Sequence, residues 1–312
     1  MDITLNLALL DFEEVALLLL ATSWLLGTRA LGPLKPLARG EEFRTVSSAE
    51  VASFRSDNEG SLFNGRAWSA AAAGAAMAKG CELQACGLWQ EGELRLLLAL
   101  RLERWSGVTL AFPLTDPLSQ YSDLQGEGDA RGLLERTVRH LARSTDARAL
   151  VFFRVRSGTA LAEALDRMGA ARLRSGQAPY IDLARHASHE AWLASFGATT
   201  RKSRRQRRRR LEARGKVAFQ AITAGAEAGR AAQAILVLKR NWMRANGLKS
   251  RVLDDPHWSS ALAEIISSAD SNAVVSCLTL DGKLIAGEIG FVAEGVYCSY
   301  LGAYDRDFAT FG

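Results

Sequence analysis

Cysteine is scarce in this chain, with four among 312 residues. Cys81 and Cys86 have no nearby histidine that would complete a zinc site, and Cys277 and Cys298 lie in apolar, strand-like runs. We therefore expect reduced, packed thiols in a reducing compartment, which excludes a disulfide scaffold and favours a cytoplasmic protein. Histidine is equally rare and none is spaced as a metal ligand, so no metal site is predicted: His140, His186, His189 and His257.

Long apolar runs are also missing. The candidate "VALLLLATSWLLG" (Val15–Gly27) is too short to span a bilayer, and acidic residues precede it where a secretory signal would be basic. We interpret residues 1–40 as an apolar leader and linker outside the main fold, either an amphipathic helix or a loose tail, with a membrane-surface anchor as the alternative. Breaker residues continue to Gly40, so folded structure is expected from about Glu41.

Charge is balanced everywhere except in one segment. The formal net charge is +5, but residues 201–214 hold nine basic side chains and one acid, Glu212, and so carry +8. The rest of the chain therefore carries −3. Hydrophobic residues make up 48% of the chain and charged residues 23%, as in globular proteins. The composition predicts a near-neutral globular body with one basic patch, whose ligand is bound locally.

Apolar periodicity and turn residues predict alternating helices and strands. In the first half we expect a strand, a helix opened by a Ser47–Glu50 capping box, a second helix, a three-stranded meander, and then helix, strand, helix and strand. Their expected positions are Phe43–Val46, Ser48 onward, Arg66–Lys79, residues 81–112, Ala130–Arg143, Ala149–Val155, residues 159–170 and Ala178–Leu183.

The second half is expected to begin with a short helix around Trp192 and a basic helix, capped by Thr199 or Thr200 and closed by Gly215. A long helix at about Ala226–Asn246 follows, and then a helix that Asp255 caps and Pro256 begins. A second meander has turns at Asp281-Gly282 and Glu294-Gly295.

The two halves share one order of elements. Gly92 and Gly107 at the turns of the first meander correspond to Gly282 and Gly295, at offsets of 190 and 188 residues. We interpret this as a duplicated α/β unit with antiparallel-rich mixed sheets, dividing the chain into domains at 41–183 and 184–312.

Helices followed by a meander that leads into "LGAYD" resemble the GNAT acyltransferase fold. The duplication, the basic helix, "W-x-x-x-N-G" (Trp242–Gly247) and "YLGAYD" (Tyr300–Asp305) narrow the resemblance to tandem GNAT families. These are the FemAB-like peptidyltransferases and, most closely, the CelD-type acetyltransferases linked to cellulose and other exopolysaccharide synthesis. The resemblance covers about Phe43 to Gly312. It implies acetyl-CoA or another acyl-CoA as co-substrate, no metal, and a small-molecule or glycan acceptor.

The second half departs from this pattern. The first copy continues from Asp116 to Leu183 through helices and strands that have no counterpart after Gly312. The resemblance places a pyrophosphate-binding loop in that part. We therefore expect a partial second domain, a half-built acyl-CoA site with little or no transfer by this chain alone, and an apolar sheet edge near Tyr300.

The resemblance also implies the site residues. Backbone N–H groups of the closing strand would polarise the acyl carbonyl, so the candidate cofactor-binding residues are Tyr300, Leu301, Gly302 and Ala303. Glu288 lies between small residues on the middle strand and is a candidate general base, and Tyr304, or alternatively Tyr300, is a candidate proton donor to the leaving thiolate. The alternatives are an exposed strand residue for Glu288 and packing or substrate stacking for the two tyrosines.

The basic helix has no apolar stripe and should lie on the surface. Its candidate anion-binding residues, for the phosphates of CoA, a nucleotide-activated sugar or an acidic glycan, are Arg201, Lys202, Arg205 and Arg208. The loop "TDPLSQYSD" (Thr115–Asp123) is a candidate acceptor-binding segment between the halves. We predict an acyltransferase; the alternatives are a tRNA-like nucleic-acid binder, less favoured because aromatic residues are not interleaved, and a non-catalytic scaffold. The sequence defines neither the acceptor nor the oligomeric state.

Overall fold

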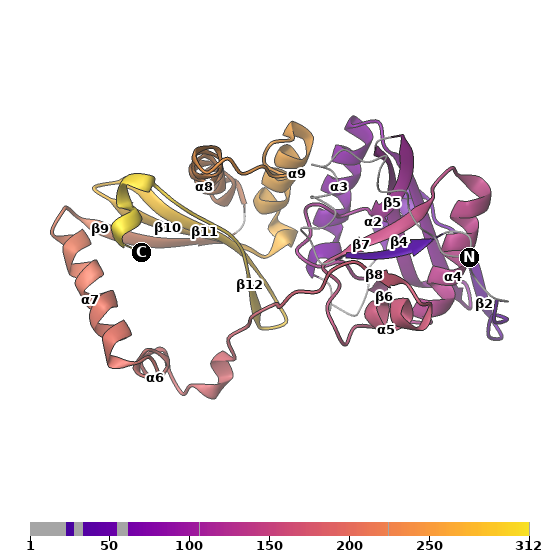
Figure 1. The fold of residues 1–312 in the computed structure, drawn as a ribbon, viewed down its shortest axis with the longest axis horizontal. Coiled ribbons are helices and arrows are strands. Elements are labelled where there is room, and N and C mark those ends of the chain that lie inside the picture. The colour runs from indigo at the N-terminus through magenta and orange to yellow at the C-terminus, as the bar shows by residue number, and fades with distance from the viewer. Residues whose placement is uncertain (1–22, 28–33, 55–61, 106, 224, 312) are drawn as a thin grey trace.

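The computed structural model describes residues 23–27, 34–54, 62–105, 107–223 and 225–311, with the backbone alone for 23–27. The chain forms two α/β units that lie side by side (Figure 1). The first contains a sheet with strand order β2-β3-β4-β5-β7-β1-β8, to which β6 adds by pairing with β4, and the second a four-stranded sheet with order β12-β11-β10-β9. Every described strand pair is antiparallel except β5 with β7, so the fold is mixed α/β with mostly antiparallel sheets.

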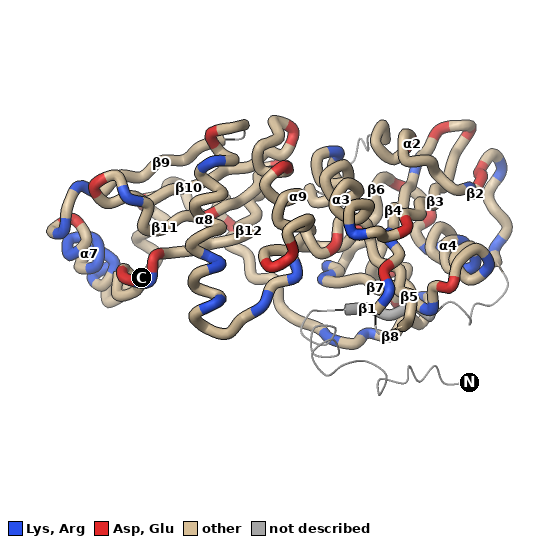
Figure 2. The backbone as a smooth tube through the Cα atoms, turned by 90° about the horizontal axis from the view of Figure 1, so that it is seen from above, with Lys and Arg blue, Asp and Glu red and all other residues tan. Residues whose placement is uncertain are grey.

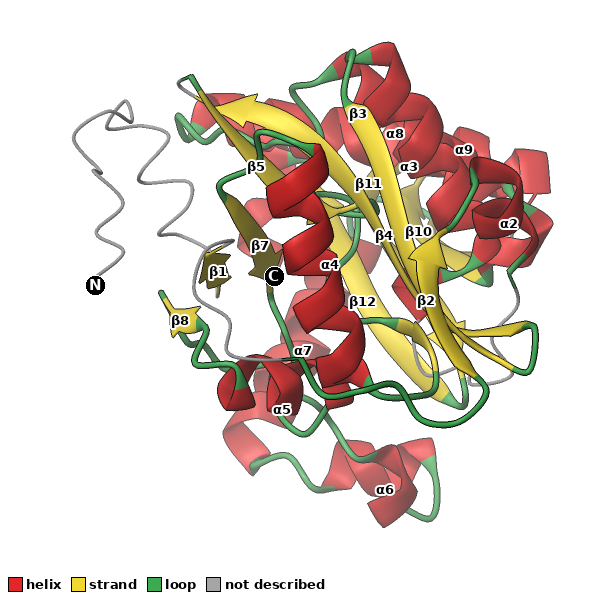
Figure 3. Cartoon of the chain, turned by 90° about the vertical axis from the view of Figure 1, so that its right-hand side faces the viewer, coloured by secondary structure: helices red, strands yellow, loops and turns green. Residues whose placement is uncertain are grey.

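Helices cover both faces of the first sheet. Helices α4 and α5 pack on one face through a Leu-rich core, and Figure 3 shows α4 crossing that face. The expected capping box is confirmed at the start of α2, where the Ser47 side chain accepts from the Glu50 N–H. The strands are β1 (Ser23–Gly27), β2 (Glu41–Thr45), β3 (Glu82–Gln90), β4 (Glu93–Trp105), β5 (Val108–Pro113), β6 (Gln125–Gly126), β7 (Ala149–Phe153) and β8 (Ala171–Arg172). The helices are α2 (Ser48–Ser53), η2 (Leu62–Asn64), α3 (Arg66–Ala78), α4 (Ala130–Ser144) and α5 (Ala160–Arg167).

The second unit begins after a connecting segment. Asp255 caps α9 as expected, because its carboxylate accepts from the N–H groups of His257 and Trp258. The helices are η3 (Leu183–Arg185), α6 (His189–Ala194), α7 (Ala198–Glu212), α8 (Gly225–Ala245), α9 (Pro256–Ser267), η4 (Ala269–Ser271) and η5 (Arg306–Phe311). The strands are β9 (Val217–Thr223), β10 (Ala273–Leu280), β11 (Lys283–Ala293) and β12 (Val296–Tyr304).

The topology confirms the duplication. Strand β2, two helices and the β3-β4-β5 meander match β9, α8, α9 and the β10-β11-β12 meander, with the same pairing order. Gly92 and Gly282 both adopt a positive φ, of 85° and 82°, at the first turn of their meander. A register shift follows Leu88 in the first meander and Leu278 in the second, again 190 residues apart.

One apolar core extends through both units. Helix α3 packs against α9, and a single cluster of buried residues includes Trp68 from the first unit and Phe291 from the second. The rings of these two residues lie 5.0 Å apart, and Tyr300 packs against both. An ion pair between Lys79 and Asp255 closes the same interface. The two repeats are therefore joined by a shared core, on both sides of the domain boundary expected between residues 183 and 184.

Two sequence interpretations were wrong. Residues 23–27 are not outside the fold, because this segment is β1 and pairs with β7 and β8; the rest of the supposed leader up to residue 22 lies outside the described residues. The strand expected at Ala178–Leu183 does not form either. Tyr180 and Ile181 are 84% and 66% exposed, and alternation of apolar residues produces no strand without an edge to pair with.

Candidate functional site

Strand β12 is an edge of the second sheet and carries a bulge. The β11–β12 register shifts between Ile289 and Gly290, which face Leu301 and Ser299, so that Tyr300 is the extra residue. Bulges re-aim side chains and are frequent beside active sites. Here the bulge directs Tyr300 into the aromatic cluster between the two units.

The first unit covers part of this edge. The Tyr300 hydroxyl donates to the Leu118 carbonyl at 2.6 Å, and the Gln120 side-chain amide donates to the Ser299 carbonyl at 2.7 Å. Burial raises the pKa of Tyr300, so its hydroxyl stays protonated and bonded. The apolar edge expected near Tyr300 is therefore not exposed there. The loop predicted to serve the cleft between the halves, Thr115–Asp123, does reach β12.

Further along β12 the backbone faces outward. Asp305 donates its N–H inward to the Ile285 carbonyl. Because the hydrogen bonds of an antiparallel pair alternate, Tyr304 and Gly302 direct their N–H groups away from β11. Gly302 leaves open space, since a Cβ atom built there meets nothing within 4 Å.

Glu288 and Tyr304 lie on the sheet face opposite α8. Gly302 pairs with Glu288 and Tyr304 with Ala286, whereas Gly287, on the other face, packs against Ile235 of α8. Glu288 Oε1 accepts a hydrogen bond of 2.6 Å from the Tyr297 hydroxyl. Burial, and then this bond, raise the pKa of Tyr297, which keeps the hydroxyl a donor at neutral pH.

A basic pocket of about 1190 Å³ lies where β12 meets the first unit. Its lining includes Tyr300 and Leu301 of β12, residues 117–121 and residues 176–180. Four cationic side chains line it, and none of its described lining residues is acidic: Arg154, Arg156, Lys239 and Lys249. No pattern in the sequence indicated this set, because its members come from distant segments of both repeats.

A buried ion cluster lies behind the basic pocket. The Asp116 carboxylate lies 3.2 Å from Arg101, 3.1 Å from Arg251 and 3.4 Å from Arg154. Burial raises the pKa of Asp116, but the guanidinium groups of Arg251, Arg101 and Arg154 outweigh it and hold the pKa below its ordinary value. Arg251 comes from the second unit, so this cluster also joins the two units.

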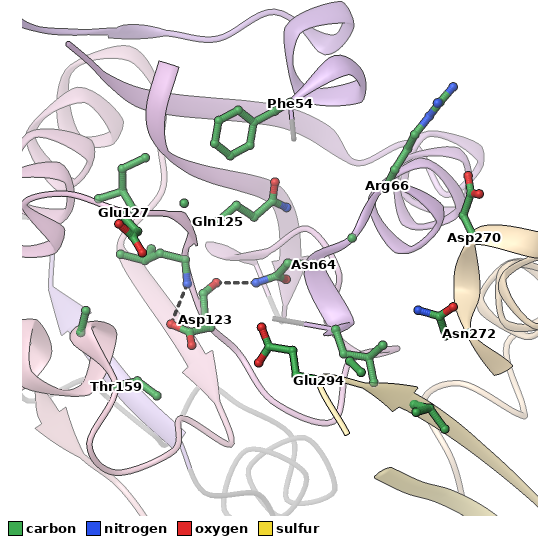
Figure 4. Close-up of a pocket in the computed structure, with 18 of the residues that line it drawn as sticks. Phe54, Asn64, Arg66, Asp123, Gln125, Glu127, Thr159, Asp270, Asn272 and Glu294 are labelled. Atoms are coloured by element: carbon green, nitrogen blue, oxygen red, sulfur yellow. Dashed lines mark hydrogen bonds between the residues drawn. The ribbon is translucent and has the colours of Figure 1, made fainter. Parts of the chain in front are cut away.

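An acidic pocket of about 1090 Å³ lies at another part of the interface (Figure 4). Glu294, at the turn after β11, points across it toward Asp123 of the first unit (Figure 4). Burial raises the pKa of Asp123. The charged residues of its lining are Arg66, Asp123, Glu127, Asp270 and Glu294. The two pockets between the units are therefore opposite in charge.

The basic helix is confirmed as α7, and Lys and Arg gather along it (Figure 2). Its N-cap is Gly197, not Thr199 or Thr200, and no side chain caps it. Leu211 is its one buried residue. Among the predicted anion-binding residues, Arg201 donates to the Ala194 carbonyl and Arg208 pairs with Glu212. None of the four predicted residues lines either pocket.

Helix α7 nevertheless lies close to the end of β12. Its last turn contacts η5, the segment that follows β12, and Arg210 and Arg214 stack on the Phe311 ring. Near its other end, Arg204 lies over the rings of Trp192 and Phe196. The tertiary structure thus places aromatic rings beside the cations that the sequence alone shows as an uninterrupted basic run.

Within the described part of the chain, no group of His, Cys, Asp and Glu side chains could hold a metal ion. No helix of that part is both long and apolar enough to cross a membrane.

Residues 198–312 match the model of a family described as an acetyltransferase (GNAT) domain. A comparison with curated proteins gave no match. The fold is similar to the crystal structure of FemX, at 13% identity and a TM-score of 0.50, over 86% of this chain and 82% of that one. Two other solved structures are similar at lower scores. One is a conserved protein of unknown function from Bacteroides thetaiotaomicron (13% identity, TM-score 0.46, 85% of this chain and 81% of that one). The other is a tandem GNAT protein from the clavulanic acid biosynthesis pathway (15% identity, TM-score 0.35, 86% of this chain and 80% of that one).

The family match supports acyl transfer in general, and the fold is a mixed α/β fold with mostly antiparallel sheets. The second unit, from α7 onward, carries the GNAT domain match, and the similarity to FemX concerns the fold alone.

Proposed function

We propose that this protein is an acyltransferase that moves an acetyl or related acyl group from acyl-CoA to an acceptor. The observation that carries the proposal is the position of β12. This strand closes the meander of the unit that matches the GNAT domain, and it combines a bulge, outward N–H groups and a pocket between the units.

The backbone of β12 supplies the donors in this proposal. The N–H groups of Gly302 and Tyr304 face the free edge, where one can bind the carbonyl oxygen of the acyl thioester as negative charge develops on it and the other can bind the pantetheine chain. The open space at Gly302 lets the thioester approach the backbone closely. Tyr300 and Leu301 line the adjoining pocket, whereas the Ala303 side chain is buried in the core.

Proton transfer is assigned to Glu288 and Tyr304. Glu288 would take a proton from the attacking group of the acceptor, and Tyr304 would donate one to the departing CoA thiolate. The Tyr297 hydroxyl holds one oxygen of Glu288 and so fixes the orientation of the carboxylate, while the other oxygen has no hydrogen bond from a described residue.

The narrower identity follows the resemblance. We assign the chain to the CelD-type acetyltransferases, acting in the cytoplasm on a saccharide or a precursor of an exopolysaccharide such as cellulose. The four reduced cysteines support the compartment. The order of motifs from the basic helix to "YLGAYD" supports the family.

The catalytic assignment predicts a split between binding and turnover. Glu288→Gln keeps the shape of the side chain but removes the base, so kcat should fall by about 100-fold while acetyl-CoA affinity stays at the wild-type value. Calorimetry with acetyl-CoA and a thiol-release assay over a panel of sugar and amine acceptors measure the two quantities. Glu294→Gln, at the end of the same strand, is the matched control and should leave both unchanged.

Acetyl-CoA binding tests the proposed function directly, and isothermal calorimetry measures it. Failure of the protein to bind acetyl-CoA would exclude the proposed function.

Helix α7 is proposed to hold the phosphates of CoA, because it lies beside η5, where β12 ends. Removing three cations with Arg201→Ala, Arg205→Ala and Arg208→Ala should weaken acetyl-CoA binding about tenfold and flatten its salt dependence, at a few tenths to 1 kcal/mol per charge. Arg143→Ala, which removes an exposed cation of α4, is the control. The nucleic-acid alternative would be favoured by a different result. The wild type would then bind RNA with a steep salt dependence, and the triple variant would lose this binding while its acetyl-CoA affinity stayed unchanged.

A further inference from the structure

We propose that the basic pocket between the units binds a phosphate-bearing acceptor. This inference rests on the proposed acyl transfer and adds the chemical class of the second substrate. The pocket is bounded by β12 at Tyr300 and Leu301, so a ligand in it lies next to the strand assigned to the acyl group.

The lining charges define the kind of ligand. Arg154 and Arg156 approach from the first unit, and Lys239 and Lys249 from the second, with no carboxylate among the described lining residues. Arg154 already pairs with Asp116, and Arg156 and Lys239 add positive charge from opposite units. A phosphate or diphosphate carries two or more negative charges and many acceptor oxygens, which suits several cations together.

Unused donors support an anion. Arg154 and Ser119 both line the pocket. Arg154 Nε and the Ser119 hydroxyl are buried and have no hydrogen-bond partner among the described residues. Arg154 is held in place by bonds to the Ser119 carbonyl at 2.7 Å and to Asp116 at 3.4 Å. Both donors are closed to solvent, so a ligand would reach them only after a small movement of the wall, and the cations of the lining are the stronger argument.

The rest of the wall suits a larger molecule than free phosphate. Tyr121, Tyr180 and Tyr300 supply rings, and the guanidinium of Arg156 lies 5.3 Å from the centre of the Tyr121 ring. The other pocket has the opposite charge and would repel the same ligand. The interface therefore directs a phosphate-bearing acceptor to the side where β12 presents Tyr300.

Inorganic pyrophosphate is the probe for this pocket. The test variant is Arg156→Gln with Lys239→Gln, because both side chains line the pocket and neither belongs to the Asp116 cluster. Isothermal calorimetry at low salt should show pyrophosphate binding that weakens about tenfold or more in this variant, from the loss of two charged contacts. The matched control is Arg230→Gln, an exposed cation on the same helix as Lys239, and it should bind as the wild type does. The pocket variant and its control are both measured in a protein that also carries Arg201→Ala, Arg205→Ala and Arg208→Ala. This background removes pyrophosphate binding by α7.

The outcomes separate this inference from the proposed function. Pyrophosphate should still bind with acetyl-CoA at saturation, because the two occupy different places. Displacement by acetyl-CoA, with equal loss of acetyl-CoA affinity in the pocket variant, would assign the pocket to the cofactor and overturn the inference. No pyrophosphate binding, or equal binding by the variant, would also overturn it, even where acetyl transfer is observed. Pyrophosphate binding that depends on the pocket, in a protein that never binds acetyl-CoA, would uphold the pocket and reject the acyltransferase.

Discussion

Asp116→Asn is expected to destabilise the protein by about 3–5 kcal/mol, because removing one partner leaves a buried charge uncompensated. Arg101 has a fully buried side chain, and Asp116 is 1% exposed. Asparagine fits the same space but carries no charge to balance Arg101, Arg154 and Arg251. A loss of this size is a large part of the free energy of unfolding of an ordinary domain, about 5–15 kcal/mol.

Urea denaturation followed by circular dichroism measures this loss. The matched control is Asp146→Asn, an exposed aspartate whose carboxylate accepts from the Thr109 hydroxyl at 2.9 Å. That variant should stay within about 0.5 kcal/mol of the wild type. An Asp116→Asn protein as stable as the control would mean that Glu103, 3.2 Å from Arg101, and not Asp116, balances the buried guanidinium.

The difference in stability between the wild type and Asp116→Asn should depend on pH in one direction. The pKa of Asp116 is lower in the folded protein than in the unfolded chain, where it is near 3.9. The stability it contributes is therefore fully present above about pH 4 and is lost as pH falls through the lower folded value. The gap between the wild type and Asp116→Asn should stay constant from neutral pH to about pH 5 and close only in stronger acid.

Trp68→Ala should destabilise both units together, by about 3–5 kcal/mol, the usual cost of removing a buried tryptophan side chain. Trp68 is 1% exposed and its ring contacts Phe63 of its own unit and Phe291 and Tyr300 of the other. The cavity therefore opens inside the core that the two units share.

Two probes show whether the units unfold as one. Thiol labelling of Cys86 reports the first unit and labelling of Cys277 reports the second, because both side chains are buried in the folded protein. Both should move to the same lower urea midpoint in Trp68→Ala, while Trp192→Ala, on α6, leaves the midpoint near the wild-type value. Separate midpoints for the two probes would show that the repeats are independent domains.

Local sequence signals account for much of the fold. The Ser47–Glu50 pair, Asp255 with Pro256, and the turns at Gly92 and Gly282 each act within a few residues, and each forms as expected. Such caps and tight turns depend on side-chain hydrogen bonds and on φ values that only a few residue types adopt. The repeated spacing of these signals was enough to identify the duplication and the resemblance to the GNAT fold.

Sequence patterns for strands, which form only beside a neighbouring strand, did not predict the structure reliably. The apolar alternation at Ala178–Leu183 resembles a strand, but no strand forms there, whereas residues 23–27, assigned to a leader, pair with β7. Pairing is decided by which sheet edge is free, and that depends on the whole topology. The four closing-strand residues stay candidates on the strand where they were placed, but the bulge that turns Tyr300 toward the first unit follows from the β11–β12 register.

The sequence by itself determined the class of protein: a near-neutral α/β duplication with a basic helix and a closing strand suited to acyl transfer. Only the tertiary structure decided which residues meet around that strand. Arg154, Arg156, Lys239 and Lys249 lie up to 95 residues apart in the chain and form one pocket because α8 packs beside the first unit through the shared core. The spacing of residues along the chain does not predict such a set. The repeats meet where their apolar side chains pack, and the hydrophobic effect that drives this packing is not directional.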